Sequence, residues 1–278
     1  MSITPRPANG IPAEAADPDH RFAVVTGASS GIGLELARLF AADGHDVLVV
    51  AEDAAIEGIP GQLIAHGQHA EALQVDLATA AGVDELRDRI AEIGRPLDAI
   101  ALNAGFAVGG GSFLETPLDD HLRMIDLNVK GVVHLAHHVA SDMVLRGEGK
   151  ILVTSSVAAL LPGPYYATYA ASKSFVQSFT EALREEIKDQ GVTVTALQPG
   201  PVDTAFFDRA DMDDTQAAKG PKTDPADVAQ AGYEALQNGD DHVVAGAPGK
   251  LMAAAAKILP DPLKAKLHGS MGKPTDDD

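Results

Sequence analysis

The chain has 278 residues, of which 45% are hydrophobic and 22% charged, a balance that supplies ample material for a buried core. It has no cysteine, which excludes disulfides, thiol catalysis and cysteine-ligated zinc. Its 21 basic and 40 acidic side chains give a net charge of −19, which disfavours nucleic acid and anionic membranes as partners. No apolar run approaches the roughly 18 residues that a membrane-spanning helix needs.

The two ends of the chain differ in composition from the middle. Residues 1–20 are rich in proline and lack an apolar stretch like that of a signal peptide, so we expect a poorly ordered leader and, by default, a cytoplasmic protein. Residues 21–245 are expected to form one domain. Residues 246–278 are then a C-terminal extension, in which 251–259 are expected to form a helix that packs within the subunit or against a partner.

Strand-like and helix-like segments alternate through the expected domain. Strands are expected at 22–25, 46–50, 72–75, 97–102, 151–155, 192–198 and 242–245. Helices are expected at 32–40, 61–69, 81–93, 118–126, 128–146, 169–189 and 224–237. Because near-continuous apolar strands alternate with helices, we expect a doubly wound parallel sheet of seven strands with helices on both faces, a Rossmann-like α/β fold of three layers. Residues 205–223 interrupt the alternation and are expected to form a mobile substrate lid.

A glycine-rich turn, TGASSGIG at 26–33, separates the first expected strand from the first expected helix. Glycines let the backbone approach a pyrophosphate closely, and a helix N-terminus supplies free N–H groups and the positive end of a dipole. A purely structural turn would also use glycine, but the strand–turn–helix context favours cofactor binding. The residues expected to contact the cofactor here are Gly27, Ser29, Ser30, Gly31, Ile32 and Gly33.

Carboxylates follow the second and third expected strands. Glu52, at the end of the second strand, could accept hydrogen bonds from an adenosine ribose and would repel a 2′-phosphate. The turn contains no Lys or Arg, and none is adjacent to Glu52, so we predict NAD in preference to NADP. The alternative is that Glu52 and Asp53 merely open a helix. Asp76, followed by Leu77, is expected to meet the adenine.

Tyr169 and Lys173 lie four residues apart on an expected helix, so their side chains share one face. A tyrosine has a reference pKa near 10 and is a poor base at neutral pH. A nearby ammonium favours the phenolate, which makes the tyrosine a usable acid or base. This spacing alone is common, and it gains weight only from the motifs around it.

Taken together, the motifs resemble those of the short-chain dehydrogenase/reductase family, in its single-domain form. The resemblance runs from about residue 21 to 245 and keeps the order of the family's motifs. The matching pieces are TGASSGIG at 26–33, Asp76, Asn103-Ala104-Gly105, Asn128, Ser156, Tyr169-x3-Lys173 and Pro199-Gly200.

The resemblance implies an NAD(P)-dependent enzyme that acts on CH–OH groups of a small-molecule substrate. It implies Tyr169 as the general acid/base and Lys173 as the group that lowers the pKa of Tyr169 and holds the nicotinamide ribose. Ser156 would bond the substrate oxygen, since Ser156 and not Ser155 has the family's spacing from Tyr169. Asn128 would anchor a water in a proton relay. Further cofactor contacts are implied for Asn103, Ala104, Gly105, Pro199, Gly200, Val202 and Thr204. A homodimer or homotetramer is also implied.

Two alternatives to a dehydrogenase remain on the same fold. One is a non-catalytic sensor or scaffold that binds the dinucleotide, and the other is an epimerase or dehydratase that keeps the cofactor bound. The first would have no need for Asn128, Ser156, Tyr169 and Lys173 together.

The expected substrate pocket has an apolar lining, which predicts a largely apolar substrate. Its expected residues are Phe106, Val108, Phe113, Leu160, Leu161, Phe206 and Phe207, with Arg209 as the one basic side chain. His134, His137 and His138 are spaced three and four apart on a helix, as metal ligands can be. No HExxH pattern or suitably spaced carboxylate accompanies them, so we expect no metal.

Overall fold

The structure, a computed structural model, describes residues 21–63, 68–109, 111–210 and 212–273. The expected leader therefore lies outside the described residues. The described chain forms one parallel sheet in the order β3-β2-β1-β4-β5-β6-β7. Its strands are β1 (Arg21–Thr26), β2 (His45–Ala51), β3 (Ala70–Gln74), β4 (Ala99–Leu102), β5 (Gly149–Thr154), β6 (Val192–Pro199) and β7 (His242–Ala245). The chain crosses over between β3 and β4, so the connections that follow the neighbouring strands β1 and β4 leave in opposite directions, and a ligand crevice is expected at their carboxyl ends.

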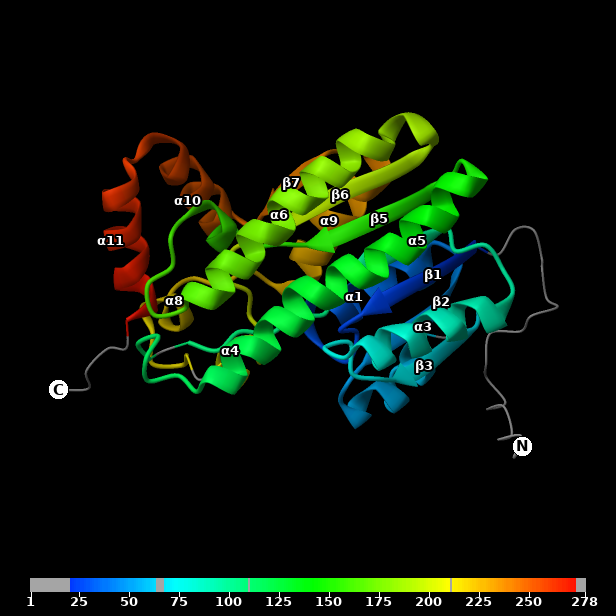
Figure 1. Cartoon of the computed structure of the whole chain (residues 1–278), viewed down its shortest axis with the longest axis horizontal. Helices are drawn as coiled ribbons and strands as arrows, with labels where there is room; N and C mark the ends of the chain where they lie inside the picture. The colour runs from blue at the N-terminus through cyan, green and yellow to red at the C-terminus, as the bar shows by residue number, and fades with distance from the viewer. Residues whose placement is uncertain (1–20, 64–67, 110, 211, 274–278) are drawn as a thin grey trace.

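Helices cover both faces of the sheet, which confirms the three-layer fold (Figure 1). One face packs against α1 (Gly31–Ala42) and α9 (Pro225–Asn238). The other packs against α3 (Ala80–Ile93), α5 (Val132–Arg146) and α6 (Ala167–Ile187). The strands feed both cores by alternation: in β1, Phe22 and Val24 enter one core while Ala23 and Val25 enter the other.

The helix boundaries follow local capping chemistry. Thr79 accepts a hydrogen bond from Gly82 N at the start of α3, and Asp224 accepts one from Ala226 N before the proline that opens α9. The helix expected at 61–69 is instead the short α2 (Pro60–Leu63), and β3 already begins at Ala70. Residues 64–67 of that expectation lie outside the described residues.

A π-helical segment changes the picture of the long central helix. The expected helices at 118–126 and 128–146 are joined, because α4 (Leu118–Ile125) continues through the π segment 126–131 into α5. Asn128 therefore lies inside this segment and does not open a helix, as the sequence had indicated. The sequence carries no breaker between the two helices, and π segments inside α-helices are frequently found at functional sites.

Short helices and the C-terminal extension gather beyond the carboxyl ends of the strands (Figure 1). The expected lid contains α7 (Phe206–Arg209) and α8 (Gln216–Lys219), and the extension forms α10 (Ala247–Ile258) and α11 (Asp261–Gly272). The helix expected at 251–259 is thus longer than expected. Glycine lets α11 approach closely: a Cβ on Gly272 would lie 2.2 Å from Cε1 of Tyr166. No described helix is both long and apolar enough to cross a membrane.

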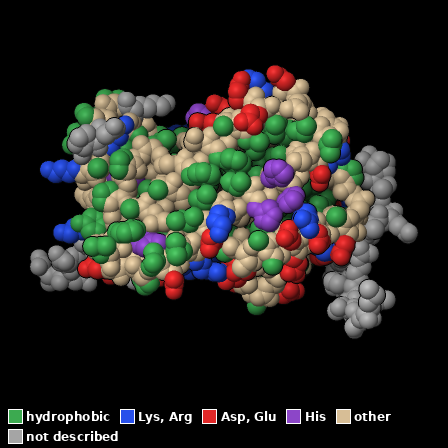
Figure 2. Space-filling model, viewed as in Figure 1, with side chains coloured by type: hydrophobic (Ala, Val, Ile, Leu, Met, Phe, Trp, Pro, Cys, Tyr) green, Lys and Arg blue, Asp and Glu red, His purple; other side chains and the backbone are tan. Residues whose placement is uncertain are grey.

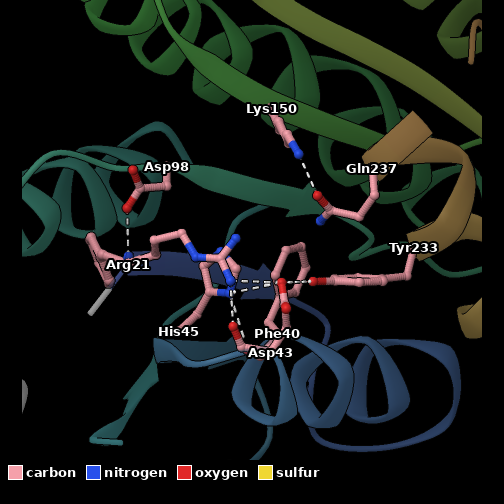
Figure 3. A network of polar contacts seen from close by, with 9 residues as sticks. Arg21, Phe40, Asp43, His45, Asp98, Lys150, Tyr233 and Gln237 are labelled. Carbon is pink, nitrogen blue, oxygen red and sulfur yellow. Dashed lines mark hydrogen bonds and ion pairs between the residues drawn. The ribbon is translucent and has the colours of Figure 1, made fainter. Parts of the chain in front are cut away.

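A polar network ties the opposite, amino-terminal edge of the sheet to α1 and α9 (Figure 3). The Asp43 carboxylate accepts a hydrogen bond from Tyr233 Oη at 2.5 Å and pairs with Arg21 at 2.9 Å. His45 is buried beside them, and its Nδ1 donates to the carbonyl of Phe40 over 3.1 Å. Burial, with the nearby Arg21 charge, lowers the pKa of His45 to about 4. His45 is therefore neutral in the folded protein at neutral pH.

Candidate active site

A cavity of about 740 Å³ lies at the carboxyl ends of the strands. With one exception, every residue assigned to the cofactor or to catalysis from the sequence lines this cavity. The exception is Asn128, which is buried behind the wall. The fold therefore brings together motifs that are spread over most of the expected domain.

The glycine turn forms one end of the cavity, and its geometry requires glycine. Gly27 has a φ of +67°, and a Cβ there would lie 2.9 Å from Cα of Ala104. A Cβ on Gly33 would lie 2.1 Å from the carbonyl oxygen of Gly27. Ser30, the N-cap of α1, makes no side-chain capping bond, and the first turn holds no acidic residue. This close-packed turn under a helix N-terminus fits a bound pyrophosphate.

The carboxylates beyond β2 and β3 line the same end, but a cation lies between them. Arg123, from α4, donates to Glu52 Oε1 at 2.7 Å and to Asp76 Oδ2 at 3.1 Å. The sequence argument for NAD assumed that no basic residue lies beside Glu52, and this premise is wrong. The tertiary fold brings Arg123 in from 71 positions along the chain. Asp53 does cap the following 3₁₀ turn, as the structural alternative required, and it also accepts a hydrogen bond from Ser29 at 2.6 Å.

The floor of the cavity is fixed by threonines from two strands. Thr26 Oγ1 accepts from the backbone N–H groups of Asn103 and Ala104, at 2.9 and 3.0 Å. Thr154 donates to the side-chain oxygen of Asn103 at 3.0 Å. These bonds hold the Asn103–Gly105 turn across β1, β4 and β5. The turn is therefore a rigid support for a ligand above it.

Tyr169, Ser156 and Lys173 all line the cavity. Tyr169 is partly buried, forms a hydrogen bond with the Ser156 side chain, and lies with its ring centroid 5.9 Å from Lys173 Nζ. Lys173 Nζ donates to the Thr154 carbonyl at 2.9 Å. Ser155, in contrast, donates its hydroxyl proton to the carbonyl of Lys173 and so braces α6. Of the two adjacent serines, Ser156 is the one directed at the tyrosine.

The protonation of this group differs from the expectation. Burial raises the pKa of Tyr169 to about 12, and the hydrogen bond to Ser156 opposes this rise. Burial also lowers the pKa of Lys173 to about 8. The expected lowering of the Tyr169 pKa by Lys173 is therefore not found in this structure, because removal from water outweighs the effect of the neighbouring amine. The phenol is protonated at neutral pH.

Asn128 acts on the loop above the floor. Its side chain accepts from Phe106 N at 3.1 Å and donates to Phe106 O at 2.9 Å, and it also bonds Ser172 Oγ at 3.2 Å. A Cβ on Gly105 would lie 3.0 Å from Asn128 Oδ1 and 3.3 Å from Lys173 Nζ. Asn128 thus holds the backbone that separates it from Lys173.

The far end of the cavity is apolar and includes residues that the sequence reasoning missed. Of the expected substrate-pocket residues, Phe106, Phe206, Phe207 and Arg209 line the cavity. Four others, Val108, Phe113, Leu160 and Leu161, are not among its lining residues. Met212, from the expected lid, also lines the cavity, and the missed lining residues are Tyr166, Met252, His268 and Met271. No sequence motif marked Tyr166, α10 or α11.

The chain matches the family model of short chain dehydrogenases over residues 21–215. It is 35% identical over 186 residues to a 3-oxoacyl-[acyl-carrier-protein] reductase of Synechocystis sp., a match that spans 66% of this chain and 75% of that protein. It is also similar to a solved short chain dehydrogenase/reductase of Burkholderia phymatum in complex with NAD, with a TM-score of 0.79, 27% identity and coverage of 94% and 98% of the two chains. A short-chain dehydrogenase of Sphingobium yanoikuyae in complex with NADPH gives a TM-score of 0.75 at 30% identity, covering 81% and 87%.

A doubly wound sheet with this glycine turn and a Tyr169–Lys173 pair in one cavity is typical of the class of oxidoreductases that bind dinucleotides. Within that class, the chain belongs to the short-chain dehydrogenase/reductase family. Solved relatives hold NAD or NADPH, which supports a nicotinamide cofactor.

Proposed function

We propose that the protein transfers a hydride between a nicotinamide cofactor and the carbonyl or carbinol carbon of a largely apolar substrate, with Tyr169 as the general acid/base. The observation that carries this proposal is the placement of Tyr169, Ser156 and Lys173 in one cavity, between the glycine turn and an apolar end. A non-catalytic sensor would need the glycine turn but not a phenol in the cavity that is hydrogen-bonded to a serine.

The side chains divide the chemistry as follows. When bound, the nicotinamide cofactor supplies or accepts the hydride. Ser156 donates a hydrogen bond to the substrate oxygen and places that oxygen beside the Tyr169 hydroxyl. Because the Tyr169 phenol is protonated at neutral pH, it is prepared to donate its proton to a carbonyl oxygen as the alcohol forms. Lys173, next to Gly105, would hold the ribose of the bound cofactor, and its charge would favour the phenolate that remains after the proton is given up.

The test of this role is Tyr169→Phe, which removes only the hydroxyl group. Turnover of a panel of apolar ketones and alcohols should fall by a factor of about 10² to 10⁴, the usual contribution of a general acid or base. Binding of the reduced cofactor, followed by its fluorescence, should be nearly unchanged. Tyr165→Phe is the matched control, since Tyr165 is not a lining residue of the cavity. Appreciable turnover by Tyr169→Phe would assign the proton transfer to another group.

We further propose NAD as the preferred cofactor. Glu52 and Asp76 outnumber the single cation between them, so the ribose end of the cavity stays acidic and disfavours a 2′-phosphate. Titration should show tighter binding of NADH than of NADPH, and Glu52→Gln should narrow the difference. If the wild type instead binds NADPH more tightly than NADH, the variant Arg123→Met tests the reason. Loss of the tight NADPH binding in this variant would identify Arg123 as the ligand of the 2′-phosphate and overturn the assignment of NAD.

The apolar lining at the substrate end of the cavity supports an apolar ketone or alcohol as the substrate. Phe206, Phe207 and Met212 approach from the lid, and Met252 and Met271 approach from the extension. Methionines adapt their shape to irregular apolar ligands. The similar Synechocystis protein is named a 3-oxoacyl-[acyl-carrier-protein] reductase, which is compatible with a ketone on an apolar chain. A panel of ketones of rising chain length, compared by kcat/KM, tests this proposal; a preference for the most polar members would contradict it.

We also propose that the protein forms a homodimer or homotetramer through the face that carries α4 and α6. Hydrophobic side chains gather on this face (Figure 2). Ile125 and the half-exposed Phe175 are among the exposed hydrophobic side chains of these two helices. A shallow apolar hollow runs between these two side chains, with Val129 and Ala171 in its wall. Sedimentation should show a dimer or tetramer that Phe175→Glu dissociates. A wild-type monomer at micromolar concentration would contradict the proposal.

A further inference from the structure

Three potential metal ligands meet on the surface between α3 and α5, away from the active-site cavity. They are Asp84 of α3 and the pair His134 and His138 of α5, and their ligand atoms all lie within 4.8 Å of one another. His134 Nε2 is 3.6 Å from Asp84 Oδ1, and the two imidazole rings are 5.1 Å apart between centroids. Figure 2 shows histidine side chains clustered on this face, with acidic and basic groups around them.

The arrangement has the features of a chelating site. Two histidines four residues apart project from the same face of a helix, so one ion can reach both. A carboxylate from a second helix adds a charged oxygen ligand. Two imidazoles and a carboxylate suit zinc and the neighbouring divalent transition metals, and three protein ligands leave a fourth position for water. All three residues are partly exposed, so an ion can enter from solvent and the side chains can close around it.

The sequence had argued against a metal here because no carboxylate stands beside the histidines. The structure supplies that carboxylate from α3, which packs alongside α5 on the same face of the sheet. We propose that Asp84, His134 and His138 bind one divalent cation of the zinc type per chain, and that the ion links α3 to α5. None of the three lines the active-site cavity, so the site is distinct from the proposed catalytic centre.

The guanidinium of Arg87 competes with a metal ion for the Asp84 carboxylate. The Arg87 guanidinium lies 2.9 Å from Asp84 Oδ1 and 2.7 Å from Asp88 Oδ1. Asp84 must leave Arg87 to ligate an ion, whereas Arg87 keeps Asp88 as a partner. Removing the guanidinium should therefore strengthen metal binding by freeing the carboxylate, while removing a ligand should weaken it.

The experiment is a calorimetric titration of the full chain with Zn²⁺ at pH 7.5. Wild type should bind one ion per chain. His134→Ala, His138→Ala and Asp84→Asn should each weaken binding by at least about tenfold, the loss that even an indirect supporting residue commonly causes. His137→Ala is the matched control on the same helix, because His137 is not one of the three ligands; it should bind as wild type does. Arg87→Gln should bind more tightly.

Thermal melting gives a second measurement, because an ion that binds only the folded chain raises the melting temperature. Zn²⁺ should raise it in wild type and His137→Ala but not in the His134→Ala/His138→Ala double variant, whose melting without metal confirms that it folds. Equal Zn²⁺ affinity in the double variant and wild type would place the ion elsewhere on this acidic protein and overturn the proposal. A wild type that binds no Zn²⁺ at millimolar concentration would overturn it as well.

Discussion

The burial of the Lys173 ammonium lowers the stability of the folded protein at neutral pH. This ammonium is fully buried, and burial lowers its pKa from a reference value of 10.5 to about 8. The folded chain therefore binds the Lys173 proton less tightly than the unfolded chain does. Below pH 8 this difference acts in full against folding, and it disappears as the pH rises from 8 to 10.5, where the unfolded chain also loses the proton.

Replacing this side chain by a neutral one should accordingly stabilise the protein. We expect Lys173→Met to raise the free energy of unfolding by about 2 kcal/mol at pH 7. Removing the buried charge stabilises the folded chain, and the loss of the hydrogen bond to Thr154 offsets part of this gain. The gain should shrink between pH 8 and 10.5, and turnover should be lost. Urea unfolding at pH 7 and 10 measures both. Lys130→Met, at an exposed position, serves as the control; a less stable Lys173→Met at pH 7 would show that the lost contacts dominate.

At this scale, what the sequence predicted depended on how far apart the partners lie along the chain. The four-residue spacing of Tyr169 and Lys173 and the contiguous glycine turn are local, so their proximity follows from helix and turn geometry. The pairing of Arg123 with Glu52 is not local, because it depends on how α4 packs beside the end of β2. For the same reason, the sequence alone could not show that the Asp84 carboxylate lies beside the histidines of α5.

At the scale of the elements, the contacts at the amino-terminal ends of the strands make the stability of the protein depend on pH. His45 is neutral in the folded chain because burial and the Arg21 charge lower its pKa from 6.5 to about 4. As the pH falls from 6.5 towards 4, the unfolded chain takes up a proton that the folded chain refuses, so stability is lost over this range. The loss attributable to His45 is up to about 3 kcal/mol.

His45→Asn tests this contribution, because the asparagine amide can replace the imidazole N–H that donates to Phe40 O. The variant should be less stable than wild type at pH 7, since it loses the edge-to-face contact with the Phe40 ring. Its free energy of unfolding should fall less steeply between pH 6.5 and 4. Chemical unfolding at several pH values gives the slope, with His242→Asn, at the sheet's last strand, as the control. Equal slopes for His45→Asn and wild type would move the acid sensitivity to another group.

Helix α11 carries no sequence motif that predicts its role, yet two of its residues, His268 and Met271, line the cavity. Gly272 rests against the ring of Tyr166, and the backbone approach leaves no room for a Cβ. Gly272→Ala should displace the helix and with it Met271 and His268, since overpacking of this kind costs about 1–3 kcal/mol.

The expected consequence is selective for one end of the cavity. The KM for substrate should rise by about tenfold, whereas the affinity for cofactor should stay the same, because the glycine turn lies at the other end. Gly61→Ala is the control, since a Cβ there meets no atom within 4 Å. A parallel loss of both affinities would mean that α11 supports the whole fold and not the substrate end alone.

For the whole molecule, the excess of acidic groups has a kinetic consequence. The net charge of −19 repels an anionic dinucleotide during its approach, even though the turn itself attracts phosphate. Salt screens this repulsion, since the Debye length shrinks from about 30 Å at 0.01 M to about 8 Å at 0.15 M. The association rate of NADH should therefore rise with ionic strength, and stopped-flow fluorescence measures it. A rate that falls with salt would show that local attraction near the turn governs the encounter.

The architecture was predictable at this scale because each strand carries its own apolar signal and each crossover its own helix. The seven strands begin or end within a few residues of their expected positions, from Phe22 in β1 to Ala245 in β7. The enclosure of the substrate end was not predictable, because residues 246–273 carry no motif and their position depends on packing against Pro164 and Tyr166. The sequence pattern therefore predicted the sheet and its helices well, and the helices around the substrate end of the cavity poorly.

The order of the cavity's walls along the chain also has a consequence for biosynthesis. The glycine turn, the floor and the Tyr–Lys pair all precede α11 on the chain, so a ribosome completes the nucleotide end before the residues that close the substrate end have emerged. A nascent chain should thus pass through a stage that accepts the dinucleotide in an open, uncapped cleft. Ribosome-bound chains stalled before and after α11, probed with fluorescent reduced cofactor, would show binding in both if the two ends mature in this sequence, and only in the longer chain if they mature together.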